Sequence, residues 1–488
     1  MPTKLIKKAF LLLSTSLLTL ASYQSQAQGP MVDPTFQPSR IFVQSTSGTK
    51  TLGVVNDVVR QPDGKYIIGG SFTEVNGVPA LNLARLNADG TPDVAYTMAC
   101  QANGPVLSLA LQPDGRLLVG GQFTTLAATS RGAVGRLMPD GTIDEAFAPT
   151  SSISSDNQIK QIALQSTGKI LLVGSFNLRN AVTARQNFAR LETTGQEDLS
   201  FQYEPLPSTS TISVVLVRPD NKIIVGLDNR TSYTSPIIRL LPDGTNDASF
   251  FPPGEYSAAS VFALATDATG RIYVSCYQYG GFILRRFSPD GGPSPDQTFQ
   301  YASPYYAYRY YGYSLAIQPN GRLLLGADDT DVTSTSIIGS LARVLDNGKP
   351  DPSFVNANGP AKGKVLRLLI QPDGAIIAAG SFQQVGTNTG INGLVRLLDT
   401  NVLRVASTET AAKTAAWPVP AHDELHLQLE AKARPQHVSL MDALGKVVHS
   451  QVVTQPELTI STAALTAGVY MLQVHYAEGM VTRRIAVQ

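Results

Sequence analysis

The segment Gln61-Pro-Asp-Gly-Lys-Tyr-Ile-Ile-Gly-Gly-Ser-Phe72 is the clearest copy of a motif that recurs seven times between residues 54 and 400. About a dozen residues after it comes a second motif, Ala84-Arg-Leu-Asn-Ala-Asp-Gly-Thr-Pro-Asp93. The second residue of each first-motif turn marks the period, and successive markers lie 49 to 53 residues apart. The markers are Pro62, Pro113, Ser166, Pro219, Ala268, Pro319 and Pro372. A period near fifty indicates stacked supersecondary units.

Each unit has the pattern of four strands in an up-and-down meander. In the first unit, apolar runs at 54–59 and 66–68 flank a Pro-Asp-Gly turn, and a run at 83–86 precedes an Asp-Gly turn and a segment that ends in an aromatic residue. Helical spacing is absent from these runs, which favours strands that are buried on both faces. One meander cannot cover its own two apolar faces, so the repeat predicts an all-β fold: a β-propeller of seven four-stranded blades over residues 28–400.

The two ends of the repeat region predict how a ring would close. Units end in Asp-x-x-Phe at 144–147, 247–250 and 351–354, but the seventh stops at residue 401 without this piece. The same motif occurs near the start of the chain as Asp33-Pro-Thr-Phe36. We therefore expect residues 32–36 to complete the seventh blade, and small residues such as Gly69 and Gly70 to let crowded backbones approach near a central axis.

These motifs resemble the delta-60 repeat family, whose units combine a Gln-Pro-Asp-Gly-Lys turn, a Gly-Gly-x-Phe run and an Ala-Arg-Leu-x-x-Asp-Gly-Thr-x-Asp-x-x-Phe ending. The resemblance covers about 370 residues and is clearest in units 1, 2 and 7. The turns of units 3, 4 and 5 depart from it, with Gln165-Ser-Thr-Gly168, Asn221 and Ala268-Thr-Gly270. The resemblance implies a β-propeller and no shared catalytic activity.

Two further segments follow the repeats. Residues 401–414 are small and polar, which is typical of a linker. Residues 415–488 contain six short runs with alternating apolar residues, separated by turns. This spacing predicts a small Ig-like β-sandwich.

The last segment resembles the C-terminal sorting domain of the type IX secretion system of Bacteroidota. The matching pieces are Trp417-Pro-Val-Pro-Ala421, Met441-Asp-Ala-Leu-Gly-Lys-Val-Val448, Leu465-Thr-Ala-Gly-Val-Tyr-Met-Leu472 and Arg483-Arg-Ile-Ala-Val487. The opening departs from the family's Tyr-Pro-Asn-Pro at Trp417 and Val419. The resemblance implies that residues 415–488 engage the type IX machinery, that the chain crosses the outer membrane, and that this domain is then removed, with release or attachment at the cell surface.

The start of the chain predicts export as well. Residues 1–27 have the pattern of a signal peptide, because Lys4, Lys7 and Lys8 precede an apolar run at 9–21 and Ser25-Gln-Ala27 offers small residues for cleavage. The apolar run is shorter than the roughly 20 residues that span a bilayer, and no later stretch comes closer, so we expect no transmembrane segment. The net charge of +1 excludes the strongly basic surface of a nucleic-acid binder. We expect a secreted protein or one on the outer cell surface.

Several kinds of catalytic or metal site are missing from the repeats. All five histidines lie beyond residue 415, so the repeats cannot form a Ser-His-Asp or Cys-His mechanism or a histidine-liganded metal site, and we expect no cofactor. His422-Asp-Glu-Leu-His426 imitates a zinc helix, but in a strand these two positions lie about 13 Å apart. Cys100 and Cys276 belong to different units, and buried free thiols are favoured over a disulfide or a nucleophile.

Acidic residues suggest calcium at two kinds of position. The repeated Asp-Gly turns are better explained as turns, because Asp bonds nearby amides and Gly accepts positive φ. Asp328, Asp329 and Asp331 break the repeat and are the better, still weak, metal candidates, although a solvated acidic loop is the favoured interpretation.

The variable connections predict where a ligand would bind. In a meander the first and third connections share one face, and the second connection and the inter-unit link share the opposite face, which is where rigid scaffolds usually carry function. One such link, residues 301–313, holds seven tyrosines. Tyrosine rings suit stacking on sugars or anchoring a protein, with packing against units 5 and 6 as the alternative. The candidate ligand residues are Tyr305, Tyr306, Tyr308, Arg309, Tyr310 and Tyr311.

Three functions fit these features. The leading hypothesis is a secreted or surface-displayed, non-catalytic binding module whose loop face takes a glycan or a protein. The alternative is an extracellular polysaccharide lyase or hydrolase that uses Asp, Tyr and Arg, although paired carboxylates cannot be identified from the sequence. A third is a structural coat or adhesion protein.

Overall fold

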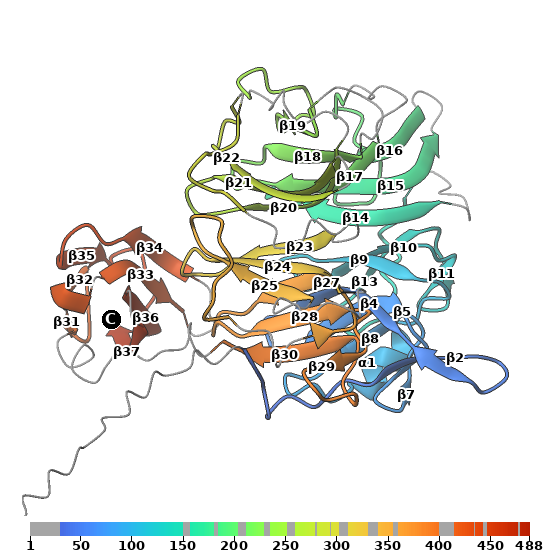
Figure 1. The fold of residues 1–488 in the computed structure, drawn as a ribbon, viewed down its shortest axis with the longest axis horizontal. Helices are drawn as coiled ribbons and strands as arrows, with labels where there is room; N and C mark the ends of the chain where they lie inside the picture. Colours follow the sequence, from blue (N-terminus) through green and yellow to red (C-terminus); the bar gives the residue numbers. More distant parts are fainter. Residues whose placement is uncertain are drawn as a thin grey trace, which may run out of the picture.

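The protein was analysed as a computed structural model, which describes residues 30–149, 157–179, 184–203, 211–228, 235–250, 259–278, 281–292, 294–301, 311–329, 340–354, 360–399, 414–433, 435–442, 447–476 and 479–488. The regular secondary structure of these residues is almost entirely β-strand (Figure 1). The exceptions are a short helix, α1 (Val94–Ala99), and a 3-10 turn at Ala431–Ala433. The all-β prediction is therefore confirmed.

Seven antiparallel meanders of three strands fill the repeat region, and we number them as units 1 to 7. In chain order their strands are β4 (Val54–Arg60), β5 (Tyr66–Ser71) and β8 (Leu83–Leu86); β9 (Val106–Leu111), β10 (Leu117–Gly121) and β13 (Val134–Leu137); β14 (Gln158–Leu164), β15 (Ile170–Arg179) and β16 (Ala184–Leu191); β17 (Thr211–Val217), β18 (Ile223–Asp228) and β19 (Ile237–Leu240); β20 (Ser260–Thr266), β21 (Ile272–Gln278) and β22 (Gly281–Phe287); β23 (Gly312–Ile317), β24 (Leu323–Asp329) and β25 (Leu341–Val344); β27 (Gly363–Ile370), β28 (Ile376–Gly380) and β30 (Leu394–Leu398).

The seven meanders form a closed cycle. The first strand of each unit contacts the first strand of the next, and β27 of unit 7 contacts β4 of unit 1. Seven apolar clusters fill the seven junctions, and the cluster between units 7 and 1 joins Ile377 and Leu394 to Val55 and Ile68. Each sheet therefore buries both faces against its neighbours, as the doubly apolar strands predict.

The fourth strand of each unit is shorter than predicted. In most units it is reduced to one β-bridge after the second turn, such as Leu137↔Ile143 in unit 2. The segment then folds back on itself, because the amide of Phe147 donates to the carbonyl of Asp144 at 3.1 Å instead of continuing the ladder. In unit 1 the same segment becomes helix α1, capped by Asp93.

The N-terminal segment supplies this piece to unit 7. Strand β1 (Met31–Val32) pairs antiparallel with β30 at Leu397 and Leu398. The amide of Asp33 donates to the carbonyl of Arg396 at 3.0 Å, which matches the bond from Asp93 to Arg85 in unit 1. The start of the segment at 32–36 therefore lies beside the last strand of unit 7.

Glycine at the end of the second strand permits a close approach of two neighbouring strands of the same unit. A Cβ added at Gly70 would lie 1.9 Å from the carbonyl oxygen of Val54 on the neighbouring strand, and one at Gly380 would lie 1.9 Å from that of Lys364. These backbones approach too closely for any side chain. The thiol side chain of Cys276 occupies the matching position in unit 5, where it is buried and free, as is that of Cys100.

Short paired strands lie in the connections before and within units 1, 2 and 7. Strands β2 (Ile41–Gln44) and β3 (Lys50–Leu52) form a sheet with β6 (Glu74–Val75) and β7 (Val78–Pro79). Two more pairs are β11 (Thr125–Leu126) with β12 (Thr129–Ser130), and β26 (Pro360–Ala361) with β29 (Gln384–Val385).

Beyond the repeats, two antiparallel sheets share one apolar core. The first contains β31 (Ala415–Trp417), β32 (Glu424–Gln428) and β35 (Glu457–Ser461), and the second contains β34 (Val447–Val452), β33 (Pro435–Met441), β36 (Gly468–Tyr476) and β37 (Gly479–Val487). Leu425 and Leu427 of one sheet and Leu472 and Val474 of the other point into the shared core. A two-sheet sandwich is therefore present, as the alternating pattern predicts.

Candidate functional site

The cycle of units has two ends that differ in chemistry. At one end lie the first and third connections of each meander, which we call the turn end. At the other lie the second connections and the inter-unit links, which we call the loop end. The first strand of every unit runs from the loop end to the turn end along the inside of the cycle.

The aspartates of the Asp-Gly turns at the turn end accept hydrogen bonds from residues of the same turn. Asp140 accepts hydrogen bonds from the amide and the hydroxyl of Thr142 at 3.0 and 2.7 Å, and Gly141 has a φ of +92°. These bonds lower the pKa of Asp140. The arrangement repeats at Asp243 with Thr245, so the described geometry supports the interpretation of these residues as turns.

A belt of buried arginines lies beneath these turns. Each unit places one arginine from its third strand against an aspartate of its closing segment. The pairs are Arg85–Asp93, Arg136–Asp144, Arg190–Asp198, Arg239–Asp247, Arg286–Asp296, Arg343–Asp351 and Arg396–Asp33. Six of the guanidinium groups also donate to the following unit, for example to the carbonyl of Pro139, Pro289 or Asp346.

Arg239 illustrates how completely the belt uses its donors. Its side chain is 1% exposed, and its Nε donates to Asp247 Oδ2 at 2.7 Å. The remaining nitrogens donate to Ser249 Oγ at 3.1 Å and to the carbonyl of Pro289 at 2.6 Å, and the guanidinium carbon lies 4.9 Å from the ring centre of Phe250. Burial alone would raise the pKa of Asp247, but Ser249, Lys222 and Arg239 hold it well below its ordinary value. The belt thus links neighbouring units, and its arginines are bound in structural ion pairs.

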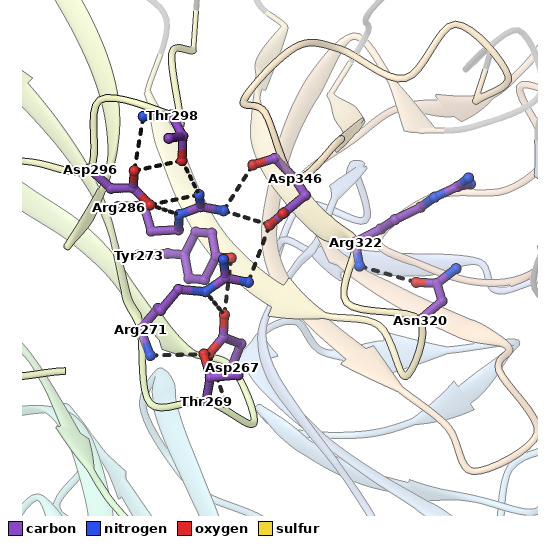
Figure 2. A network of polar contacts seen from close by, with 10 residues as sticks. All are labelled: Asp267, Thr269, Arg271, Tyr273, Arg286, Asp296, Thr298, Asn320, Arg322 and Asp346. Carbon is purple, nitrogen blue, oxygen red and sulfur yellow. Dashed lines mark hydrogen bonds and ion pairs between the residues drawn. The ribbon is translucent and has the colours of Figure 1, made fainter. Parts of the chain in front are cut away.

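Unit 5 carries a variant of this network (Figure 2). Its arginine and aspartate are ten residues apart instead of eight. Arg271 therefore turns to Asp267 at 2.6 Å and to Asp346 of unit 6 at 3.2 Å, and Arg286 donates to the same Asp346 oxygen at 2.5 Å. A hollow of about 350 Å³ beside Asp346 is lined by Thr298, Leu345 and Asn347. It is open, and Asp346 on its wall is already engaged by both arginines.

The inner strands carry a feature that the turns do not. Each contains a β-bulge near the loop end, which leaves one residue per unit outside the ladder. The bulged residues are Asn56, Leu107, Lys160, Ser213, Phe262, Tyr313 and Leu366. The next residue often bonds across the junction, as when Asp57 Oδ2 accepts from the amide of Leu109 at 2.8 Å.

Aromatic residues gather at the loop end of units 5 and 6. The ring centre of Tyr311 lies 5.2 Å from that of Phe262, 5.3 Å from that of Tyr277 and 6.0 Å from that of Tyr313. Phe262 and Tyr313 meet edge to face at 5.8 Å. All four rings are half-buried. We call these four residues the aromatic cluster.

A lysine and an aspartate border the aromatic cluster. The ammonium of Lys364, on β27 of unit 7, donates to the hydroxyl of Tyr313 at 3.1 Å, lies 3.3 Å from Asp328 Oδ2 and sits 5.1 Å from the ring centre of Tyr313. Burial alone would lower the pKa of Lys364, but Tyr313 and Asp328 raise it. Burial raises the pKa of Tyr313 more than Lys364 lowers it. At neutral pH Lys364 is thus an ammonium and Tyr313 a protonated phenol.

Sequence comparisons identify both parts of the chain. A family described as a domain of unknown function, beta-propeller (DUF5122), matches residues 61–96, 112–147, 165–201, 218–250, 318–354 and 371–398. A secretion system C-terminal sorting domain matches residues 415–488. The chain is a β-propeller repeat protein with a C-terminal sorting domain. The sorting domain, of the type IX system, marks the propeller for export to the cell surface or the extracellular space.

Known structures resemble the propeller chain only distantly. The extracellular domain of a protein classed as a one-component system of B. thetaiotaomicron is 15% identical, with a TM-score of 0.47, over 91% of this chain and 54% of that one. The propeller chain therefore spans little more than half of that domain. A protein of unknown function from Bacteroides caccae (12% identity, TM-score 0.31, 75% of this chain and 98% of that one) and a glucose dehydrogenase (14%, 0.34, 60% and 95%) are also similar. Likenesses at these scores assign no function, and no curated protein sequence matches significantly.

The family match omits unit 5 of the propeller, between residues 250 and 318. This is the unit with the displaced aspartate and the altered turn at Asp267. It also contributes Phe262 and Tyr277 to the aromatic cluster. The unit that departs most from the repeat at the turn end is thus one that builds the cluster at the loop end.

The structure places only some of the predicted ligand residues. Tyr311 lies in the aromatic cluster. Tyr301 is 8% exposed and packs edge to face with Phe282 at 5.7 Å in the core between units 5 and 6, so the packing alternative holds for this residue. Tyr305, Tyr306, Tyr308, Arg309 and Tyr310 lie outside the described residues.

The predicted acidic loop needs a correction. Asp328 and Asp329 belong to strand β24, which pairs with β27 through Asp328↔Lys364 and Asp329↔Gly363. Asp328 is buried and bonded to Lys364, so the prediction that it sits in a solvated loop is wrong. The pairing of β24 with β27 extends to the last residue of β24, so Asp328 lies on a paired strand and not in a loop. Asp331 lies outside the described residues.

Sequence reasoning missed Phe262, Tyr277 and Lys364. They come from three strands of two meanders, units 5 and 7, and share no motif. Aligning the repeats at the bulge position would have found part of the signal, because only units 5 and 6 place an aromatic residue there.

Neither a metal site nor a membrane helix occurs in the described ranges. No group of three or more His, Cys, Asp or Glu side chains in them is arranged to hold a metal ion. Within the same ranges, no helix has the length and hydrophobicity of a membrane span.

Proposed function

We propose that this protein is an exported, non-catalytic binding module whose loop end takes a glycan or protein ligand. One observation carries the proposal: four aromatic rings and a lysine converge at the loop end of units 5 to 7, whereas the arginines of the belt at the turn end are engaged in structural ion pairs. The tyrosines at 305–310 precede the cluster directly in the chain and belong to the proposed ligand surface. Residues 415–488 engage the type IX machinery.

The proposed organisation follows the repeat. Residues 28–400 form a seven-bladed propeller of the delta-60 type, supported by the closed cycle of contacts and by the pairing of Met31–Val32 with β30. Residues 1–27 are the signal peptide, 401–414 the linker and 415–488 an Ig-like sandwich. If the N-terminal segment closes the cycle of units, Asp33→Ala should accelerate hydrogen exchange at residues 394–398 and leave the exchange rate at residues 134–137 unchanged. An equal change in rate at both strands would argue against closure by this segment.

A polysaccharide-active enzyme is the weaker alternative. A lyase that uses tyrosine as a base needs a phenol whose pKa approaches the working pH. Burial raises the pKa of Tyr313, the cluster tyrosine that touches a lysine. Lys364 is bonded to a carboxylate, which favours its charged form and makes it a poor base.

The test is binding and turnover by the chain without its predicted signal peptide, residues 28–488, which we call the mature chain, on a panel of soluble polysaccharides and on outer-surface protein extracts. The variant carries Ala at Tyr305, Tyr306, Tyr308, Tyr310 and Tyr311, and Phe42→Ala, on the β2–β3 hairpin, is the aromatic control. Saturable binding that is lost only in the five-tyrosine variant, without product, supports the proposal. Product formation would favour the enzyme, and no ligand of either kind would favour a structural coat.

A further inference from the structure

We infer that the aromatic cluster and Lys364 form a subsite for one uncharged pyranose ring of a glycan, with Tyr311 as the central stacking residue. This inference rests on the proposed function, because it names the ligand class for the same face. It uses only residues that the structure describes: Phe262, Tyr277, Tyr311, Tyr313, Lys364 and Asp328.

The ring geometry favours a stacking surface over a cage. The rings are 5.2 to 6.0 Å apart between centres, so they pack on one another and leave no room for a guest between them. Two of the four contacts are edge to face and two are tilted by 34° and 39°. Half-buried rings fixed in this way offer apolar area at little entropic cost, which suits the CH-rich face of a pyranose ring.

The polar rim supplies both kinds of hydrogen-bonding partner that sugar hydroxyls need. Lys364 is 38% exposed, and its contacts with Tyr313 and Asp328 engage two of the three ammonium donors. The phenol of Tyr313 accepts from Lys364 and keeps its own proton to donate. A hydroxyl group, which both donates and accepts, matches this rim better than an apolar ligand does.

The charges at the subsite favour an uncharged ligand. The carboxylate of Asp328, 5% exposed, lies 3.3 Å from the ammonium of Lys364. Arg367, the other cation on β27, is paired in the same way, because its Nε lies 2.9 Å from Asp57 Oδ1. Lys160 belongs to unit 3, whose inner strand contacts those of units 2 and 4 instead. A uronate carboxylate would therefore meet a cation that is already neutralised, with a buried anion behind it.

The test compares matched oligosaccharides on the mature chain by calorimetry. Neutral gluco-, manno- and xylo-oligosaccharides are set against the uronate counterparts of the first two, polyglucuronate and polymannuronate fragments of equal length. We expect the wild type to bind a neutral ligand at least about fivefold more tightly than any uronate. Tyr311→Ala should weaken neutral binding about tenfold, which corresponds to about 1.4 kcal/mol, because the variant loses the stacking face.

A charge variant tests the neutralisation directly. Asp328→Asn keeps the shape and leaves Lys364 uncompensated, so uronate binding should improve about three- to fivefold while neutral binding stays within about twofold. Asp114→Asn, an exposed turn-end aspartate, is the matched control and should change neither. Near-ultraviolet circular dichroism establishes that each variant is folded.

These measurements distinguish failure of the pyranose subsite from failure of the proposed binding function. Tighter uronate binding by the wild type, or neutral binding that ignores Tyr311, overturns the uncharged-pyranose subsite and leaves the binding function in place. A protein ligand with no glycan binding does the same. Absence of saturable binding to every glycan and protein overturns both.

Discussion

Replacing Arg239 with methionine is the sharpest test of the arginine belt. The substitution keeps much of the apolar stem and removes a guanidinium that bonds Asp247, Ser249 and the carbonyl of Pro289. Removing one partner of a buried ion pair costs roughly 3–5 kcal/mol, because a charge is left uncompensated. Lys222 remains 2.9 Å from Asp247 and lowers this cost. We therefore expect a loss of about 3 kcal/mol, or roughly 150-fold in the unfolding equilibrium.

The chain provides its own internal control for this measurement. Its single tryptophan, Trp417, lies in the sorting domain, so tryptophan fluorescence follows that domain during denaturation. Near-ultraviolet circular dichroism is dominated by the tyrosines of the propeller. Arg239→Met should lower the midpoint of the transition seen by near-ultraviolet circular dichroism and leave the fluorescence transition unchanged. Lys50→Met breaks an exposed pair with Glu74 and should change the free energy of unfolding of the propeller by less than about 1 kcal/mol. An Arg239→Met effect as small as that of Lys50→Met would refute the view that the belt holds the units together.

Three further outcomes follow from the structure. Gly244→Ala should cost about 1–3 kcal/mol more than Gly77→Ala in denaturant titrations, because both have positive φ (+95° and +82°) but only the first would place a Cβ 2.6 Å from a buried aromatic ring; equal costs would contradict this. Cys100 and Cys276, whose pKa values burial raises to about 12, should resist a thiol reagent in the native protein and yield two free thiols after unfolding; no reactive thiol after unfolding without a reductant would indicate a disulfide. Five of the belt aspartates (Asp93, Asp198, Asp247, Asp296 and Asp351) have folded pKa values below the unfolded value near 4, so their stabilisation is complete above that pH and declines as the pH falls further; the propeller transition should be constant from about pH 8 to 5 and fall below about pH 4, and a rise on acidification would contradict the pairing.

The repeat made most of the fold predictable. Its period, its turns and the displaced Asp33 motif predict the seven meanders and the role of the N-terminal segment. The fourth strand was overestimated, because the Asp-x-x-Phe motif folds into a turn of its own and its amides bond within the motif. The sequence pattern of that segment does not distinguish a strand from such a turn.

The contacts between units could not be predicted from the sequence. The glutamine that opens the first-motif turn was interpreted only as part of a turn, yet Gln165 Nε2 of unit 3 donates to the carbonyl of Asn221 in unit 4 at 3.2 Å. The aromatic cluster likewise joins residues 262, 277, 311 and 313, which come together through the bulges and the curvature of the cycle. Periodicity predicts which residues repeat, whereas these contacts depend on the residues that break the repeat.

The central claim is that the loop end of units 5 to 7 binds ligand and the turn end holds the propeller together. Hydrogen exchange of the mature chain, with and without a saturating glycan from the panel, tests it most directly. We predict slower exchange at residues 260–264, 311–316 and 363–367, and no change at the turns at 241–245 and 345–349. Protection confined to those turns, or spread evenly over all seven units, would contradict the claim.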